Sequence, residues 1–213
     1  MVNIQDTKNE QVQFLRNSDI FTTSQRGVTT QSDTGTFSSD STHTLSTNPT
    51  TAKNVRSVII DSNTLTYGKD YTINFLTGVI TFTTAQSGDY TISYDTGTDK
   101  IYPDFPRDDL TINSYPRIAV DILNAPFSPF GIGGSSFISD VNMTIVVYDN
   151  NSNDLDGYIQ TIKDLYVSNS KNFYYLSYVN ITMIGPTINS QDKKDEIMQK
   201  NIDIIGRFNV DNG

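Results

Sequence analysis

The chain lacks cysteine and tryptophan and contains a single histidine, and each shortage removes a class of function. Without cysteine there is no disulfide framework and no thiolate metal site, and the redox compartment stays undetermined. The acidic residues are nearly all aspartates, because Glu10 and Glu196 are the only glutamates. Aspartate beside glycine, asparagine and serine is typical of turns rather than of helical charge ladders.

Long apolar runs and basic patches are also missing. No stretch approaches the roughly 20 apolar residues that a membrane span needs, and the polar start, residues 1–6, has no signal-peptide character. The 15 basic residues are outnumbered by 24 acidic ones, for a net charge of −9. Wrapping nucleic acid requires a dense patch of lysine and arginine facing the phosphates, and no such patch is present. We therefore expect no membrane partner and no specific DNA binding, and a protein that is made and assembled in a cytoplasm.

The composition that remains favours a β-rich protein. The 213 residues suffice for one domain with an inserted module or for two small domains. Hydrophobic residues make up only 36% of the chain, but it contains 12 tyrosines and 11 phenylalanines. A thin core of this kind suits a protein whose stability comes partly from contacts between subunits.

The clearest pattern is a β-meander in the first half of the chain. Apolar and polar residues alternate from Tyr71 to Phe75, a turn follows at Leu76–Gly78, and Val79–Phe82 runs back. A third strand is predicted at Tyr90–Tyr94, where the alternation resumes. We assign residues 54–100 to this rigid β module.

The segments before the module differ in character. Val12 and Leu15 stand at helical spacing, so residues 1–21 are predicted to hold a short amphipathic N-terminal helix. Residues 22–53 are rich in serine, threonine, glycine and aspartate with scattered apolar residues. Such a segment cannot form its own core, and we expect an extended arm that becomes ordered against a neighbour.

Residues 101–213 predict a second unit that reads strand, loop, strand, helix, strand, strand. The helical stripe includes Leu155, Ile159, Ile162 and Tyr166. The expected elements are strands at 117–123, 137–148, 173–184 and 197–210, a loop at 124–136 and a helix at 153–167. The predicted fold class is α+β: a mixed or antiparallel sheet covered by an amphipathic helix, with an inserted all-β meander module and an extended N-terminal arm.

Tests for catalytic chemistry favour structural readings. His43 lies in the Ser/Thr-rich arm, where we expect a solvated loop residue rather than a catalytic base. The segment Asp149–Gly157 resembles a calcium loop, but aligning Gly157 with position six puts Lys163 where an EF-hand needs a bidentate glutamate. A strand-to-helix turn capped by Asn153 or Asp154 explains the segment better.

Two further clusters carry little catalytic signal. Asp104, Arg107, Asp108 and Asp109 lie between prolines, and paired carboxylates can serve acid–base catalysis. Acids in such a loop are more often solvated or paired with a neighbouring arginine. The glycine-rich segment 131–134 precedes no capped helix and no Lys-Ser/Thr pair, so a phosphate cradle is not supported. We expect no enzyme activity, no cofactor and no metal.

The order of parts resembles tail terminator or tail-completion proteins from the neck of long-tailed bacterial and archaeal viruses. Four segments carry the resemblance: Phe14–Ile20, Asp104–Leu110, Ser114–Val120 and Ile184–Thr187. The resemblance implies a structural virion protein that forms a homo-oligomeric ring, commonly a hexamer. Such a ring sits on the tail tube protein, presents its other face to the head connector and other neck proteins, and lets DNA pass through its channel.

The expected contact residues lie in loops. The segment 124–136 combines aromatic and aliphatic residues with prolines and glycines, which suits a docking surface if these side chains do not fold back onto their own core. The candidate interaction residues are Phe127, Phe130, Ile132, Arg107, Asp108 and Asp109. The hairpin end at 189–195 is expected to project as well. The alternative function is a viral surface, decoration or receptor-recognition β protein.

Overall fold

A computed structural model describes residues 4–103, 115–130, 136–192 and 195–208. The chain divides into two units: unit 1 comprises Met1–Ile20 and Lys100–Gly213, and unit 2 comprises Phe21–Asp99. Unit 2 is thus inserted into the sequence of unit 1. The described residues form helices and largely antiparallel sheets, which confirms the α+β class.

Unit 1 is built on one long sheet with the strand order β10-β12-β9-β7-β6. All pairs are antiparallel except β6 with β7, and two short strands extend the sheet, β11 beside β12 and β8 beside β9. The elements are α1 (Ile4–Asn17), β6 (Ile101–Tyr102), β7 (Arg117–Asn124), β8 (Phe127–Phe130), β9 (Ser136–Asp149), α3 (Ser152–Ser168), β10 (Leu176–Ile184), β11 (Ile188–Asp192) and β12 (Asp195–Phe208).

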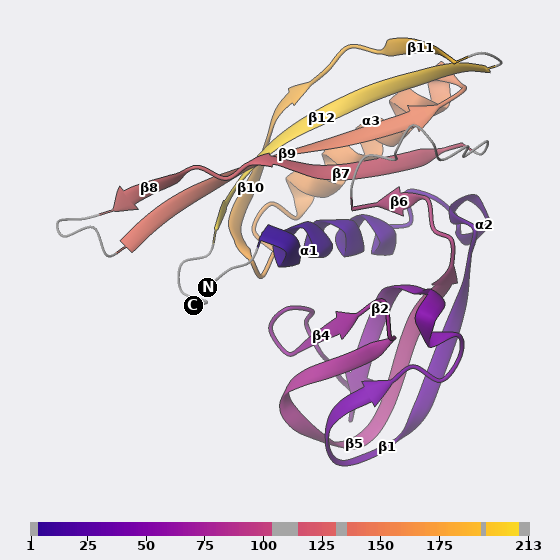
Figure 1. The fold of residues 1–213 in the computed structure, drawn as a ribbon, viewed down its shortest axis with the longest axis vertical. Helices are drawn as coiled ribbons and strands as arrows, with labels where there is room; N and C mark the ends of the chain where they lie inside the picture. The colour runs from indigo at the N-terminus through magenta and orange to yellow at the C-terminus, as the bar shows by residue number, and fades with distance from the viewer. Residues whose placement is uncertain (1–3, 104–114, 131–135, 193–194, 209–213) are drawn as a thin grey trace. The chain divides into compact units, whose positions relative to one another are not determined.

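Helix α3 packs on one face of this sheet (Figure 1). Its residues Leu155, Ile159, Ile162 and Tyr166 recur every three to four positions and are buried, as a helix on a sheet requires. The side chain of Lys200 on β12 forms an ion pair with Asp156 of α3 at 2.8 Å. The same sheet face therefore carries the alternate β12 residues that include Ile202 and Ile204.

Helix α1 differs from α3 because much of its buried surface is polar. Thr7, Gln11, Gln13 and Arg16 are buried together with Leu15. Two hydrogen bonds replace part of the missing apolar contact: the Tyr166 hydroxyl donates to Gln11 Oε1 at 2.9 Å, and Arg16 Nε donates to the Ile101 carbonyl at 3.1 Å. Sequence periodicity predicts the helix through Val12 and Leu15 but not this polar docking.

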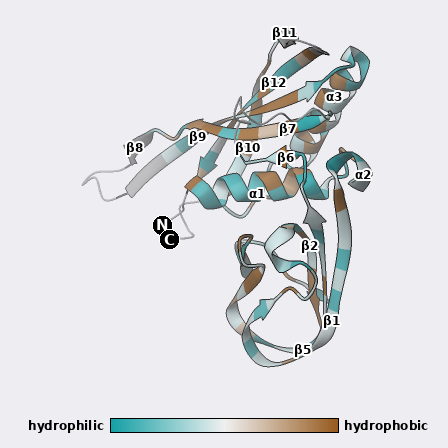
Figure 2. Ribbon diagram, turned by 45° about the vertical axis from the view of Figure 1, so that its right-hand side comes forward, coloured by the Kyte–Doolittle hydropathy of each residue, from teal (hydrophilic) through white to brown (hydrophobic). Residues whose placement is uncertain are grey.

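Unit 2 is a curled antiparallel sheet with the strand order β1-β5-β2-β3 and β4 paired to β5. Its two long strands, β1 and β5, pair over most of their length. In Figure 2, β1 runs mostly in neutral to hydrophilic colours. The elements are α2 (Thr23–Arg26), β1 (Val28–Thr44), the 3₁₀ turn η1 (Pro49–Thr51), β2 (Ala52–Ile60), β3 (Asn63–Thr64), β4 (Tyr71–Asn74) and β5 (Val79–Gly97).

The core of unit 2 lies inside this curl and is lined by both long strands. Phe37 and Leu45 come from the Ser/Thr-rich part of the chain, whereas Ile80, Ile92 and Tyr94 come from β5. The turn between β4 and β5 needs glycine, because Gly78 has φ +69° and a Cβ there would lie 2.4 Å from Pro49.

A buried ion-pair cluster closes one end of unit 2. Arg26, the last residue of α2, pairs with Asp95 at 2.9 Å and also with Asp99, and all three side chains are at most 1% exposed. Arg56 reaches Asp95 from β2 at 2.7 Å. Since buried charges are tolerated only when they are well paired, this cluster ties α2 to the strands around it.

Two sequence expectations differ from the structure. Residues 22–53, expected as a separate extended arm, contribute β1 and the start of β2 to the same unit as the meander. The reason is that β5 supplies a hydrogen-bonding partner along nearly all of β1, so β1 needs few apolar residues of its own. The third strand of the meander is not separate, because Val79–Gly97 is one continuous strand.

Candidate functional site

The segment 124–136, expected as a loop, is in part a β-hairpin. Strand β8 pairs with the first residues of β9, from Phe127 opposite Ser139 to Phe130 opposite Ser136. The neighbouring strands β12 and β7 pair with β9 only from Asp140 and Asn142 onward. The hairpin therefore continues beyond the rest of the unit 1 sheet (Figure 1).

The prolines of this segment explain why the sequence favours a loop. Pro129 lies within β8, and a proline is tolerated in a strand that is paired on one side only. At the root of the hairpin, Leu123 is 56% exposed and Asn142 donates to Asn124 Oδ1 at 2.5 Å. An exposed leucine at the base of a projecting hairpin adds apolar surface to a candidate contact region.

The structure places two of the six candidate contact residues and leaves their role in contacts a prediction. Phe127 and Phe130 both lie on β8, where the strand but not these side chains is described. Ile132, Arg107, Asp108 and Asp109 lie outside the described residues, as does the rest of the cluster with Asp104. The segment 189–195, expected as a hairpin end, lies largely in β11, which pairs with the start of β12.

His43 is not the solvated loop residue that the sequence predicts. Its Nε2 lies 3.2 Å from the Asp33 carboxylate, and its ring packs against those of Phe37 and Tyr90 at centroid distances of 5.6 and 5.1 Å. Asp33 also accepts hydrogen bonds from the Ser46 amide and hydroxyl and from the Tyr94 hydroxyl. The curl of β1 brings positions 33 and 43 together, which sequence spacing along one strand does not suggest.

This cluster contains serine, histidine and aspartate but does not have the geometry of a catalytic triad. In a triad the histidine lies between the serine and the aspartate and removes the serine proton. Here Ser46 and His43 both bind the Asp33 carboxylate. Burial by itself raises the pKa of Asp33, but the hydrogen bonds from Ser46, His43 and Tyr94 outweigh it and hold the pKa below its ordinary value. The arrangement anchors the curl of the sheet.

A second polar cluster joins α1 to the segment before β10. The Glu10 carboxylate accepts the backbone N–H groups of Tyr174 at 2.6 Å and Tyr175 at 3.4 Å. Burial raises the pKa of Glu10 to about 7, although these two hydrogen bonds oppose the rise. Burial together with nearby carboxylates also raises the pKa of the Tyr175 phenol to about 12.

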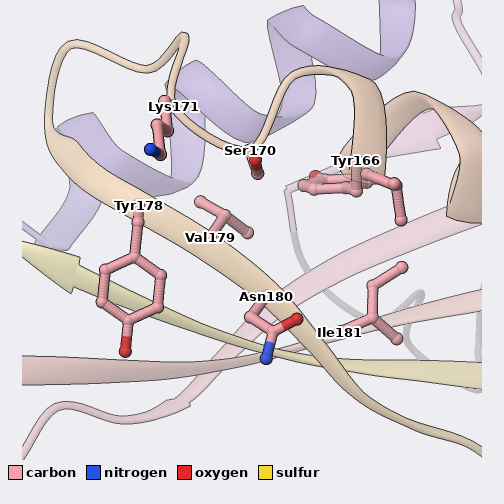
Figure 3. A pocket seen from close by; sticks show the side chains of 8 residues that line it. Tyr166, Ser170, Lys171, Tyr178, Val179, Asn180 and Ile181 are labelled. Atoms are coloured by element: carbon pink, nitrogen blue, oxygen red, sulfur yellow. The ribbon is translucent and has the colours of Figure 1, made fainter.

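A groove of about 380 Å³ lies beside β10 (Figure 3). One wall is formed by Tyr166, Val167, Ser170 and Lys171 at the end of α3 and in the turn after it, and the other by the consecutive residues Tyr178–Ile181. Side chains alternate between the two faces of a strand, so a groove bordered by four consecutive residues follows the edge of β10. Val167 is 63% exposed at this edge.

The turn Asp149–Gly157 acts as a helix start. Asn151 is the N-cap of α3 and accepts from the Asn153 backbone, whereas the sequence predicted Asn153 or Asp154 as the cap. Asp149 accepts from the Asn151 backbone at 2.8 Å. Within the described ranges, no group of three or more histidine, cysteine, aspartate or glutamate side chains is placed to hold a metal ion.

No known protein-family model matches the chain, and no curated protein is found to be similar to it. In the part of the chain that the structure describes, no helix combines the length and the apolar character needed to cross a bilayer.

Proposed function

We propose that this chain is a structural virion protein of the neck of a long-tailed virus. It assembles into a ring, with six subunits as the expected number, that caps the tail tube and joins the tail to the head connector. The observation that carries the proposal is the β8–β9 hairpin, which continues beyond the helix-covered sheet of unit 1.

A projecting hairpin supports assembly for an energetic reason. A two-stranded hairpin alone is at best marginally stable in water, because it has no third strand or helix on which to bury a face. Packing against another subunit supplies that face. A contact between two different surfaces of the same chain, repeated around an axis that closes, generates a ring.

The charge of the chain agrees with a conduit for DNA. The net charge of −9 gives an acidic subunit, and an acidic channel repels the phosphate backbone and limits adhesion as DNA passes. In this function the ring binds no specific sequence and turns over no substrate.

The hairpin can be tested by changing Phe127 and Phe130 together to serine. We expect sedimentation velocity to show loss of the ring with the subunit still folded by circular dichroism. The matched control is Leu76→Ser, which removes an 84% exposed leucine from the turn between β4 and β5 in unit 2 and should leave the ring intact. A double variant that assembles like the parent chain contradicts the role of the hairpin.

One observation favours the alternative, a viral surface, decoration or receptor-recognition protein. Unit 2 is a β-rich unit that exposes Leu76 at a turn, as recognition modules do. The two functions differ in assembly: a ring with an open channel supports the neck, whereas a trimer or a monomer supports surface recognition. Loss of function in the Leu76→Ser variant with assembly unchanged also favours recognition.

A further inference from the structure

Each unit has a sheet that ends on one long strand. In the described strand orders the terminal strands are β1 and β3 in unit 2 and β10 and β6 in unit 1. Strand β1 has 17 residues and β10 has 9, whereas β3 and β6 have two each. The outer edges of β1 and β10 are therefore the longest rows of backbone groups at the ends of these sheets.

The outer edge of β1 can be identified from two hydrogen bonds. The Val58 carbonyl of β2 accepts from the Leu65 backbone N–H, so the backbone groups of Val58 point away from β5. Ile92 of β5 lies opposite Val58, and its backbone groups therefore point to the other side, toward Asp33 of β1. The bond from Thr98 N to the Gly27 carbonyl gives the same alternation. The backbone N–H and C=O groups of odd-numbered β1 residues therefore face β5, and those of even-numbered residues point away from it, toward the outer edge.

The outward residues of β1 form a uniform row. Thr30, Ser32, Thr34 and Thr36 have exposed side chains, and none of them is charged. The whole strand contains no lysine, arginine or proline, which are the residues that commonly protect a sheet edge from pairing. The regular register from Val28 to Ser38 leaves this stretch free of bulges.

The outer edge of β10 has a different character. Val179 donates its backbone N–H to the Ser170 carbonyl at 2.8 Å, away from β12, so Ile181 is the next residue whose backbone groups point outward. β10 contains no charged residue and no proline. Further along it, Met183 and Ile184 are 52% and 40% exposed, and the groove follows the strand at Tyr178–Ile181.

We propose that strand β1 of one copy adds to the edge of β10 in the next copy, so that a β-sheet continues across each subunit boundary. The inference rests on the proposed ring and names one of its contacts. Backbone hydrogen bonds between the strands supply the attraction, and the groove beside β10 receives side chains of the added strand.

The charge distribution makes a second copy the occupant. Copies of a chain with net charge −9 repel one another, and this repulsion is weaker where the facing side chains carry no charge, as on β10 and along the outward row of β1. Two members of that row, Thr30 and Thr36, donate their hydroxyls to the Asp95 and Asp89 carboxylates of β5, so Ser32 and Thr34 form its least charged part. Threonine and isoleucine also favour strand pairing. Because β1 and β10 are different surfaces, their contact is heterologous and propagates around a ring, whereas β1 paired with β1 stops at a dimer.

The absence of cysteine allows a direct test by cross-linking. Four double variants combine Ile181→Cys with Thr30→Cys, Ser32→Cys, Thr34→Cys or Thr36→Cys, which samples the registers in which one of these residues faces Ile181 in an antiparallel pair, the orientation of nearly all strand pairs in this chain. After oxidation of the assembled protein, we expect at least one double variant to give a ladder of covalent oligomers on a denaturing gel that ends at the ring size. The five single variants should assemble but run as monomers on the denaturing gel.

Two outcomes overturn the inference without affecting the ring. One is a ring that forms normally in all four double variants but gives no ladder. The other is a covalent dimer from a single variant on β1, which shows β1 paired with itself. Failure of the parent chain to form any ring overturns the proposed function and the contact together.

A backbone variant gives an independent readout. Thr34→Pro removes an outward N–H and leaves the bonds between β1 and β5 in place, because a proline is tolerated at a sheet edge. We expect it to lose the ring in sedimentation velocity while keeping its circular dichroism spectrum, and Thr34→Val, which keeps the N–H, to assemble. Equal assembly of a folded Thr34→Pro variant contradicts the proposal. If Thr34→Pro does not fold, the cross-linking result decides.

Discussion

The α3 layer of unit 1 and the two polar clusters of unit 2 bury different kinds of side chain. In unit 1, α3 covers its sheet with Leu155, Ile159 and Ile162, so apolar burial holds the layers together. In unit 2, the buried groups include the Arg26 cluster and the Asp33 carboxylate, which must be paired to be tolerated. The stability that apolar layers provide does not depend on pH, whereas a buried ion pair becomes destabilising when one partner is removed or neutralised.

The largest effect is expected where a charge enters the apolar interface of unit 1. Ile162 is fully buried, and Ile162→Asp places a carboxylate between α3 and the sheet, at a cost of about 4 kcal/mol in the free energy of unfolding. The control is Thr161→Asp at the exposed neighbouring position, which should change stability by less than about 1 kcal/mol. An unchanged melting temperature for Ile162→Asp contradicts the packing of α3.

A slightly smaller loss is expected when a buried charge is removed from unit 2. Arg26→Leu takes the guanidinium away from Asp95 and Asp99 and should cost about 3 kcal/mol, measured by urea unfolding. The ion pair of Lys200 with Asp156, whose carboxylate is 61% exposed, provides the control, because Lys200→Met should cost less than about 1 kcal/mol. Equal losses in the two variants would remove the contrast between buried and exposed pairs.

Glu10 should give unit 1 a pH dependence that its apolar layers lack. Its pKa is raised to about 7 in the folded chain, so its contribution to stability is full below the unfolded value and is lost as pH rises through 7. Between pH 5 and pH 8 the loss should be about 2 kcal/mol. Urea unfolding at both pH values should show a smaller loss for Glu10→Gln, and parallel curves for the two proteins contradict this role.

Asp33 should give the stability of unit 2 the opposite pH dependence. Its pKa is lowered on folding, so its stabilising contribution is present above the unfolded value and is lost as pH falls through the folded pKa. At neutral pH Asp33→Asn should cost between about 1 and 2 kcal/mol, because a charged acceptor is replaced by a neutral one. The variant should also lose less stability in acid than the parent, and an equal acid loss in both refutes the assignment.

The smallest effect is expected at the histidine. His43→Ala removes one hydrogen bond to Asp33 and a ring that packs on Phe37, for a loss of about 1 kcal/mol. Ring assembly, measured by sedimentation velocity, should not change, since a structural histidine has no part in turnover. Loss of assembly with the subunit still folded would give His43 a functional role.

The same contrast explains what the sequence could predict. The apolar repeat of α3 and the alternation in β7 and β9 are local patterns, so those elements follow from the sequence to within a few residues. Strand β1 does not follow from the sequence, because the buried position 33 is an aspartate and interrupts the apolar alternation. The strand forms through pairing with β5, which lies far along the chain. Local periodicity carries no information about such a partner.

The candidate contact surfaces show the same division. Composition marks Phe127 and Phe130 as candidate contact residues, but Pro129 between them favours a loop, whereas the structure has a strand that tolerates proline. The groove beside β10 depends on the turn after α3 meeting Tyr178–Ile181, a contact that no sequence motif marks. The order of the strands in each sheet, which makes β1 and β10 terminal strands, follows from the structure and not from the sequence.

The central claim, that this chain works by assembling into a ring, is tested most directly by negative-stain electron microscopy of the purified protein near neutral pH. The account predicts ring-shaped particles with an open channel, as a closing heterologous contact produces, and with about six subunits, as the resemblance to tail terminators implies. A population of monomers or compact trimers without a channel would contradict it.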